Sequence, residues 1–312
     1  MSEVELDPAA LARAATWGAV GRDWVAGLPM VLAELAQEWG LTLGASLSGG
    51  TGSYVTTVTT REGGPAVLKV TLPDPSFGQQ VGTMVRAEGR AYAVVQGHDA
   101  GRSAVLLEAL GRPVETDDVD PAPLLQVGAR LLLQAWQVPR DPADAEAPDV
   151  DDKAAGLIEL IRDELNRIDE VVDQRVVDRA LHHLERRQAS WDPERAVVVH
   201  GDPHVNNMLP VLAPRPGAVG GYVFVDPDGF LADPAYDLGV LVREWCTHLL
   251  QAPDPTREVE GWCRLLAGVT GLDEEVIWEW GYIERVTTGL HLMGLGLVRR
   301  GRPFLDVAAR LR

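Results

Sequence analysis

The chain has 312 residues, 46% of them hydrophobic, so it can fill a large core arranged as one domain or two lobes. Its 46 acidic and 28 basic side chains give a formal net charge of −18, which disfavours nucleic acid and anionic membranes as partners and favours small cationic molecules. The 2 cysteines cannot form a disulfide framework, and no apolar run reaches the length of a membrane span. The acidic start is unlike a signal peptide, so we expect a cytoplasmic protein. We also expect a monomer or weak dimer.

The first part of the chain has the pattern of a small sheet with one or two helices. Apolar residues recur at helical spacing over 28–40, and strands are predicted over 43–47, 54–60, 66–72 and 103–110. A helix is predicted over 77–97. We therefore predict a lobe of antiparallel strands plus helix over residues 1–110.

From about residue 111 the chain reads as mainly helical, with helices predicted over 124–138, 153–173 and 176–191. Two acidic, proline-containing stretches, 115–122 and 139–152, are interpreted as solvated connections. Two short apolar strands interrupt the helices near 197 and 223. The fold class is therefore α+β, with a helical C-terminal lobe over residues 111–312.

Polar residues concentrate directly after these two short strands. The first is followed by His200-Gly-Asp202-Pro-His204-Val-Asn-Asn207, and the second by Asp226-Pro-Asp228. If the two strands form a hairpin, their carboxylates lie side by side. One carboxylate can then act on a hydroxyl as a general base, while the other and an amide oxygen hold Mg²⁺, as phosphoryl transfer requires.

Lys69 completes the pattern from the first lobe. The chain has two lysines, Lys69 and Lys153, and a lysine inside the apolar strand Ala66–Leu72 is costly unless it is paired or faces a ligand. Its expected partner is Glu88 on the following helix. A glycine-rich loop precedes Lys69, and its backbone N–H groups can approach phosphate oxygens: Ser48, Gly49, Gly50, Gly52 and Ser53.

These motifs resemble the aminoglycoside phosphotransferase family. There the loop reads H-G-D-x-H-x-x-N, and the later segment reads I/V-D followed by six residues and D-P-x-x-D-L, as in residues 225–238 here. The resemblance runs in order from about residue 43 to 245. The strings at 23–29 and 104–110, with Trp39, are more narrowly similar to the streptomycin kinase and hydroxyurea kinase branch.

The resemblance implies a two-lobed protein-kinase-like fold that uses Mg²⁺ and ATP or GTP. Asp202 would be the catalytic base, and Asn207 and Asp226 the Mg²⁺ ligands. Lys69 would contact the α- and β-phosphates and pair with Glu88.

The same resemblance implies supporting roles for other residues. The backbone from Glu108 to Leu110 would be the hinge that binds the purine. His200 and Asp237 would brace the catalytic loop. Asp228 has no counterpart in the corresponding kinase motif, and either a metal-binding or a bracing role is open to it.

Residues that contact the acceptor molecule are harder to predict. A cationic acceptor needs acidic and aromatic side chains, and we single out Glu244, Trp245, Glu279 and Trp280. Trp278 and Trp280 cannot both face the core, because side chains two residues apart on a helix point in different directions. One of them is therefore expected to line a pocket, although a solvated acidic face is an equally simple interpretation of this stretch.

The most plausible acceptor is an aminoglycoside-like antibiotic, which the protein would phosphorylate on a hydroxyl. Alternatives are hydroxyurea, a macrolide, an amino alcohol or a sugar, and a nucleotide-binding pseudokinase is a further one. A hydrolytic metal site built on His200 and His204 is a rival hypothesis, but zinc enzymes need further ligands at set positions, and it leaves Lys69 unexplained.

Overall fold

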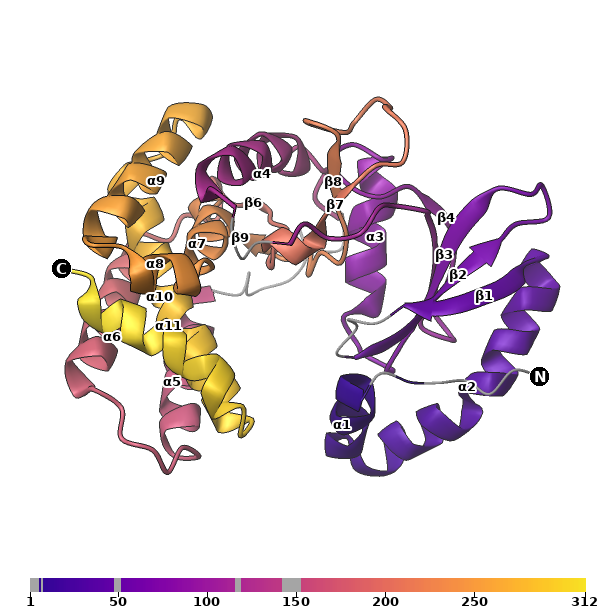
Figure 1. The fold of residues 1–312 in the computed structure, drawn as a ribbon, viewed down its shortest axis with the longest axis horizontal. Coiled ribbons are helices and arrows are strands. Elements are labelled where there is room, and N and C mark those ends of the chain that lie inside the picture. The colour runs from indigo at the N-terminus through magenta and orange to yellow at the C-terminus, as the bar shows by residue number, and fades with distance from the viewer. Residues whose placement is uncertain (1–5, 7, 48–51, 116–118, 142–152) are drawn as a thin grey trace.

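The computed structural model describes residues 6, 8–47, 52–115, 119–141 and 153–312. The chain folds into two lobes, with the N-terminal sheet and its helices on the right of Figure 1 and the helical lobe on the left. No helix in the described part of the chain is both long and apolar enough to cross a membrane.

The N-terminal lobe is built on a five-stranded antiparallel sheet with the strand order β1-β2-β3-β5-β4. Its strands are β1 (Thr42–Leu47), β2 (Ser53–Thr59), β3 (Pro65–Thr71), β4 (Val95–Asp99) and β5 (Ala104–Glu108). Along β3, Ala66, Leu68 and Val70 are buried on one face. Lys69 points to the opposite face, because successive side chains of a strand alternate.

Two helices cover the face of Leu68 and Val70: α1 (Pro8–Thr16) and α2 (Gly18–Trp39). Leu28, Leu32 and Leu35 of α2 join these strand residues in one buried cluster. The helix predicted over 28–40 is therefore the second half of a longer helix.

The helix predicted over 77–97 is wrong in its second half. α3 spans Phe77–Ala87, and the chain leaves the helix because Glu88 and Gly89 have left-handed backbone angles, with φ of 51° and 76°. Ala91 is also left-handed. The chain then returns as β4, which the sequence pattern did not reveal.

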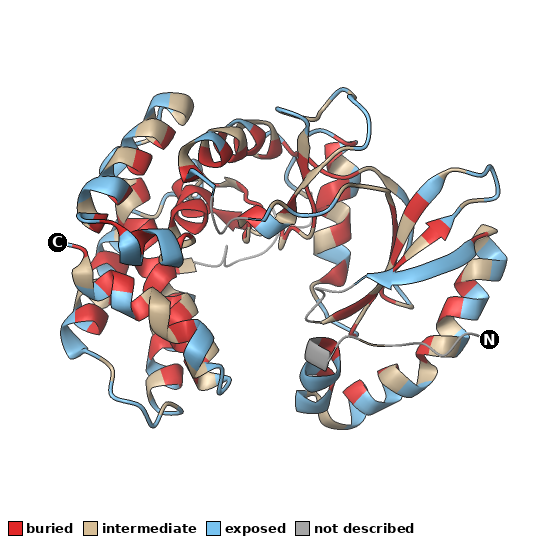
Figure 2. Ribbon diagram, in the orientation of Figure 1, coloured by how far each residue is buried: buried red, intermediate tan, exposed pale blue. Residues whose placement is uncertain are grey.

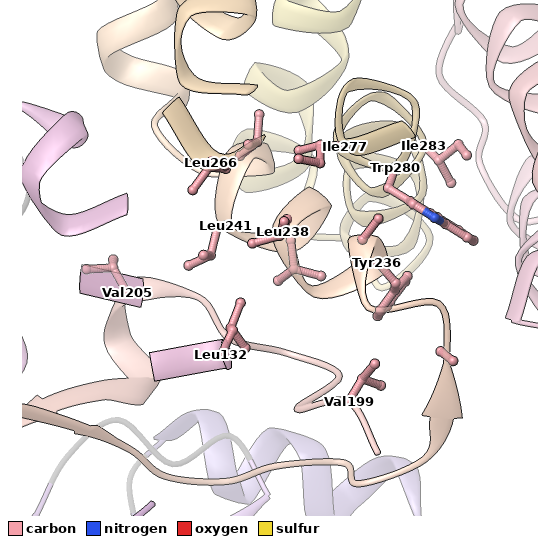
Figure 3. Close-up of a cluster of buried hydrophobic side chains, with 14 of the residues drawn as sticks. Leu132, Val199, Val205, Tyr236, Leu238, Leu241, Leu266, Ile277, Trp280 and Ile283 are labelled. Atoms are coloured by element: carbon pink, nitrogen blue, oxygen red, sulfur yellow. The ribbon is translucent and has the colours of Figure 1, made fainter. Parts of the chain in front are cut away.

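The C-terminal lobe is a helical assembly around α10 (Glu274–Gly294), which contacts five neighbouring helices. The other helices are α4 (Pro121–Ala135), α5 (Lys153–Leu165), α6 (Gln174–Ala189), α7 (Ala235–Arg243), α8 (Cys246–Gln251), α9 (Pro255–Thr270) and α11 (Val298–Arg310). Figure 2 shows that buried residues dominate α7 and the inward faces around it. In Figure 3, Leu238 and Leu241 of α7 lie close to Leu266 and Ile277.

Two small antiparallel ladders lie between the lobes. β6 (Val197–Val198) pairs with β9 (Leu231–Ala232), and β7 (Met208–Pro210) pairs with β8 (Tyr222–Phe224). The expected hairpin of the strands near 197 and 223 is therefore wrong, because each finds another partner. The polar loops still meet, since Val199 N–H donates to Phe230 O and Asp228 N–H donates to His200 O.

The β7–β8 unit also joins the N-terminal lobe through its backbone. Tyr92 forms a parallel β-bridge with Phe224, and Ala93 N–H donates to Phe224 O at 2.8 Å, while Phe224 N–H donates to Ala91 O. On the other side Leu110 forms an antiparallel bridge with Val211. We propose residue 110 as the boundary between the two lobes, in the connection between the end of β5 at Glu108 and the start of α4 at Pro121.

A side chain strengthens this junction. Arg215, in the loop between β7 and β8, donates to the carboxylate of Glu108 and to the carbonyls of Gly89 and Tyr92, at 2.7 and 2.9 Å. The Glu108 carboxylate also accepts a hydrogen bond from the Val94 N–H. The two lobes are therefore connected by more than their linker.

Candidate active site

Lys69 and Asp226 meet across the two lobes. The Lys69 ammonium lies 2.7 Å from Asp226 Oδ1, and the Lys69 side chain is 16% exposed. Asp226 follows β8 and has a left-handed backbone with φ of 56°, which is strained for a residue other than glycine. The strained turn presents its carboxylate to the N-terminal lobe.

The predicted pairing of Lys69 with Glu88 is wrong. Because α3 ends at Ala87, Glu88 lies beyond the helix, where its side chain is 76% exposed and 3.8 Å from Arg90. A carboxylate in this position faces solvent, and Lys69 pairs instead with Asp226.

The glycine-rich loop is described in part. Ser48, Gly49 and Gly50 lie outside the described residues. Gly52 accepts the Leu72 N–H, and the buried Ser53 begins β2 opposite Thr71. Their part in holding phosphates stays a prediction.

The loop after β6 holds Asp202 between two cationic side chains. Arg243 Nη2 donates to Asp202 Oδ1 at 2.5 Å, and His204 Nε2 lies 3.3 Å from Asp202 Oδ2. Burial alone would raise the pKa of Asp202, but the His204 hydrogen bond and the Arg243 charge lower it below the usual value of an aspartate. Asp202 is therefore ionised at neutral pH.

Asn207 is tied to both polar loops. Its Nδ2 donates to Asp202 O at 2.9 Å, and its own carbonyl accepts the N–H of Val225, the residue before Asp226. The backbone of Asn207 is thus held next to the residue that precedes Asp226. The Asn207 side-chain oxygen and the Asp226 carboxylate are hard oxygen donors of the kind that Mg²⁺ takes, one or two from the protein and the rest from phosphates and water, so the pair fits such an ion.

His200 and Asp237 hold the loop from beneath. The buried Asp237 carboxylate accepts the N–H groups of His200 and Gly201 and the Trp136 indole N–H, each at 2.8 Å. Burial raises the pKa of Asp237 to about 7, against the lowering effect of these three donors. Burial lowers the pKa of His200 to about 4, so its neutral ring accepts the Asp202 N–H at Nδ1 and donates from Nε2 to Val225 O.

Asp228 lies against the same loop. Gly201 has φ of 90°, and a Cβ at this position would lie 2.7 Å from the Cβ of Asp228, so the close approach requires glycine. Burial, with the Asp202 charge, raises the pKa of Asp228 to about 6, and Lys153 partly opposes the shift. The Asp228 N–H donates to His200 O, a bracing contact.

Two cationic residues near the site escaped the sequence prediction. Arg243 has no motif of its own, although it follows the D-P-x-x-D-L segment by five residues. Lys153 was noted only for the rarity of lysine, and its ammonium lies 4.7 Å from the ring centre of Phe230 and 5.1 Å from that of Tyr236. The available signals were the arginine at the end of the apolar helix α7 for Arg243 and the scarcity of lysine for Lys153.

The residues predicted to contact the acceptor lie in different environments. Glu244 lies beside Arg243, with Oε1 at 3.2 Å from Nε, and stays 27% exposed, so its predicted role remains open. Trp245 is wrong as a contact residue, because it is 9% exposed and its ring packs in the apolar core beside Leu241 and Met208.

Glu279 and Trp280 are also buried and engage other parts of the protein, so their contact with an acceptor stays a prediction. Trp280 packs edge-on against Tyr236 and donates its indole N–H to Asp233 at 3.2 Å. Glu279 is 1% exposed and lies 2.7 Å from both Arg186 and Arg187 of α6. Trp278 is the tryptophan that lines a pocket, a hollow of about 510 Å³ on the face of α10 toward α6 and α9, turned away from Trp280.

The rival hydrolytic metal site finds no support. Among the residues that the structure describes, no group of three or more His, Cys, Asp and Glu side chains is placed to hold a metal ion. His200 is fully buried and bonded on both ring nitrogens.

The protein has a two-lobed α+β fold in which a lysine of the sheet pairs with an aspartate next to an H-G-D loop. This combination defines a kinase-like phosphotransferase. Solved structures agree on this fold. The GDP complex of wild-type aminoglycoside 2'-phosphotransferase-IIIa matches with a TM-score of 0.59 and 14% identity, over 89% of this chain and 97% of that one. An ethanolamine kinase of Plasmodium vivax matches with a TM-score of 0.58 and 12% identity, over 86% and 82%.

Residues 38–293 match the model of the aminoglycoside/hydroxyurea antibiotic resistance kinase family, and the chain belongs to this family. The predicted resemblance, the kinase-like fold and the assignment as an enzyme are confirmed. The streptomycin 6-kinase of Streptomyces glaucescens is 27% identical over 282 residues, which cover 88% of this chain and 86% of that protein. The hydroxyurea phosphotransferase of Kitasatospora aureofaciens is 27% identical over 268 residues, covering 84% and 72%.

Proposed function

We propose that the protein transfers the γ-phosphoryl group of ATP or GTP to a hydroxyl of an aminoglycoside-type antibiotic. The observation that carries the proposal is the 2.7 Å pair of Lys69 and Asp226, which joins the sheet to the loops of Asp202 and Asn207. We infer that the Lys69 ammonium and the side-chain oxygens of Asp226, Asn207 and Asp202 act together on a triphosphate.

The residues divide the work by their chemistry. Asn207 and Asp226 would hold Mg²⁺, which supplies positive charge that shields the phosphates. Lys69 binds phosphate oxygens. Asp202 orients the acceptor hydroxyl, whose oxygen attacks the γ-phosphorus in line as the bond to the β-phosphate oxygen breaks, and the hydroxyl proton passes to the Asp202 carboxylate as the new bond forms. With its lowered pKa, Asp202 is a weak base before the bond forms and contributes chiefly by orientation.

The acceptor side carries carboxylates that suit a cationic molecule. Asp228 and the 27% exposed Glu244 lie near Asp202, as the effect of the Asp202 charge on the pKa of Asp228 and the contacts that Asp202 and Glu244 share with Arg243 indicate. The streptomycin 6-kinase among the relatives supports an aminoglycoside, and the hydroxyurea phosphotransferase makes hydroxyurea the second candidate.

The test is a panel assay of the purified protein with Mg²⁺ and ATP or GTP. The acceptors are streptomycin, other aminoglycosides, hydroxyurea, a macrolide, an amino alcohol and a sugar. We expect nucleoside diphosphate release together with a phosphorylated aminoglycoside detected by mass spectrometry. Turnover of hydroxyurea alone would favour the second candidate, and nucleotide binding without turnover of any acceptor would favour a pseudokinase.

The Asp202→Asn variant is the companion experiment. We expect kcat to fall by about 10² to 10⁴, because the hydroxyl loses its orienting acceptor, while nucleotide affinity stays within about threefold. Wild-type turnover in Asp202→Asn would refute the role of this residue.

A further inference from the structure

Arg243 connects three carboxylates from three segments of the C-terminal lobe. Besides Asp202, its guanidinium reaches Glu284 Oε2 of α10 at 2.7 Å through Nη1 and Glu244 Oε1 at 3.2 Å through Nε. The Arg243 side chain is 12% exposed and that of Glu284 is 4% exposed. A planar guanidinium with every edge engaged has one orientation available to it.

The backbone beneath Arg243 is fixed as well. The fully buried Arg285 of α10 donates to Val242 O at 2.6 Å and to Arg243 O at 2.7 Å, which are carbonyls at the free end of α7. A Cβ on Gly239 of the same helix would lie 2.5 Å from Trp280 Cβ, so α7 and α10 are in close contact. α10 therefore holds both the guanidinium of Arg243 and the helix that carries it.

A purely structural arginine would be satisfied by Glu284 and Glu244. Arg243 also contacts a third carboxylate, that of Asp202 in the catalytic loop, at 2.5 Å. That carboxylate is 36% exposed, and its other contact is with the His204 ring. The His204 ring is itself oriented, because its Nδ1 accepts the Asn206 N–H. The rigid support for the loop aspartate therefore comes from α7 and α10.

We infer that Arg243 is a positioning residue for phosphoryl transfer: it fixes the rotamer of Asp202 from the buried side, so that the exposed edge of the carboxylate meets the acceptor hydroxyl. This inference rests on the proposed function. It adds a residue outside the motif loops, supplied by the contact of α7 with α10. A misplacement of about 1 Å at a reacting group can cost about 10²-fold in rate, which sets the scale of the effect.

The test compares Arg243→Ala, Arg243→Gln and Arg243→Lys with Arg186→Gln. Arg186 is a matched control, because it also bridges two carboxylates of α10, Glu275 and Glu279, but on the face turned away from Asp202. We expect the Arg243 variants to lose about 10- to 100-fold in kcat, with Lys least affected, and to keep the KM of the nucleotide within about twofold. Arg186→Gln should keep the wild-type kcat.

Two readouts separate positioning from mere stability. Added guanidinium ion should restore part of the kcat of Arg243→Ala and leave Arg186→Gln unchanged. In an Asp202→Asn background, Arg243→Gln should cause no further loss of kcat, because the carboxylate it orients is already removed. Arg243→Gln and Arg243→Lys keep most of the side-chain volume, so they serve if the alanine variant does not fold.

The possible outcomes lead to different conclusions. A full additional loss in the Asp202→Asn background, or wild-type kcat in folded Arg243→Gln, would overturn the role of Arg243 and leave the proposed function intact. An inactive wild type with every acceptor would overturn the proposed function and this inference together.

Discussion

At the scale of single residues, Lys69 is the side chain on which the site depends. Its ammonium faces a carboxylate of the other lobe at 2.7 Å, and that carboxylate lies on a strained turn. An ion pair of this kind, 16% exposed on the lysine side, is partly desolvated and available to exchange one anionic partner for another. A triphosphate offers such a partner.

The Lys69→Met variant should weaken nucleotide binding. Loss of a charge-assisted contact to phosphate is expected to raise the KM of the nucleotide by about 10- to 100-fold, as measured by steady-state kinetics and calorimetric titration. The matched control is Lys153→Met, which removes the second lysine, near Phe230 and Tyr236, and should leave nucleotide affinity unchanged. Equal effects of the two variants would contradict the assignment of Lys69.

The pair of Asp202 and His204 should make stability depend on pH. Burial acts against both charges, but their hydrogen bond raises the pKa of His204 and, with Arg243, lowers that of Asp202. A raised histidine pKa stabilises the fold below the unfolded value of ~6.5, and a lowered aspartate pKa stabilises it above ~3.9. The contribution is therefore complete between these values and declines on either side.

The measurement is urea unfolding of wild type and His204→Asn from pH 3 to 9. The difference in unfolding free energy should be largest between pH ~4 and ~6.5 and should shrink toward pH 9 as His204 deprotonates. A difference that does not vary with pH would show that the two side chains do not interact as ions. Because this experiment measures unfolding free energies, its result does not depend on the kinetic assays of the Asp202 variant.

The sequence motifs identified Asp202, Asn207 and Asp226 as candidate site residues, because their spacing in two loops is short and specific. They could not name Arg243, which is separated from Asp202 by 41 residues and reaches it only through the packing of α7. The predicted contact of Glu88 with Lys69 was wrong for a local reason. The helix α3 ends one residue before Glu88, so the side chain faces the solvent and not the sheet. Motif spacing predicts chemistry within a loop better than contacts between elements.

At the scale of elements, the contact between α7 and α10 sets the position of the catalytic loop. Gly239 of α7 faces the backbone of Trp280 and Gly281, where an added Cβ would come within 2.5 to 2.8 Å. The absence of a side chain at Gly239 thus lets two helices approach closely, and Asp237 and Arg243 reach the loop from the same helix.

The Gly239→Ala variant should therefore be destabilised. Overpacking against a neighbouring backbone is expected to lower the unfolding free energy by about 1–3 kcal/mol, measured by urea unfolding. Gly268→Ala is the control, because Gly268 lies in α9 with no heavy atom within 4 Å of the added Cβ. That change should be neutral or stabilising by about 0.5–1 kcal/mol, and equal losses in both variants would exclude a packing effect.

Elements with long periodic patterns were predictable, and short ones were not. The helices α4, α5 and α6 begin within a few residues of their predicted positions, because each has a sustained apolar stripe. β4 was missed because three left-handed residues end α3 early, and β7 because three residues carry no periodic signal. Pairing of β8 with β7 depends on this undetected strand.

At the scale of the whole molecule, the lobes are joined by backbone bridges and by Arg215. Arg215 and Glu108 are each 19% exposed, so their charges are largely removed from water. Glu108 also belongs to the predicted purine hinge. The N-terminal sheet is thereby fastened to the β7–β8 unit that carries Asp226.

The Arg215→Met variant tests this connection. It leaves the half-buried carboxylate of Glu108 without its cation, and we expect a loss of about 2 kcal/mol in unfolding free energy, between the values typical of exposed and buried pairs. The double variant with Glu108→Gln should recover part of the loss, because the unpaired charge is gone. A double variant less stable than Arg215→Met would contradict this account.

The backbone bonds of Ala91 and Ala93 with Phe224 are a junction between the two lobes. Points close to a junction move least in a tilt about it, and Asp226 is two residues from Phe224, whereas α2 lies at the far right of Figure 1. A rigid tilt of the N-terminal lobe about this junction would displace α2 more than Asp226, and it would carry Lys69 of β3 along with the sheet.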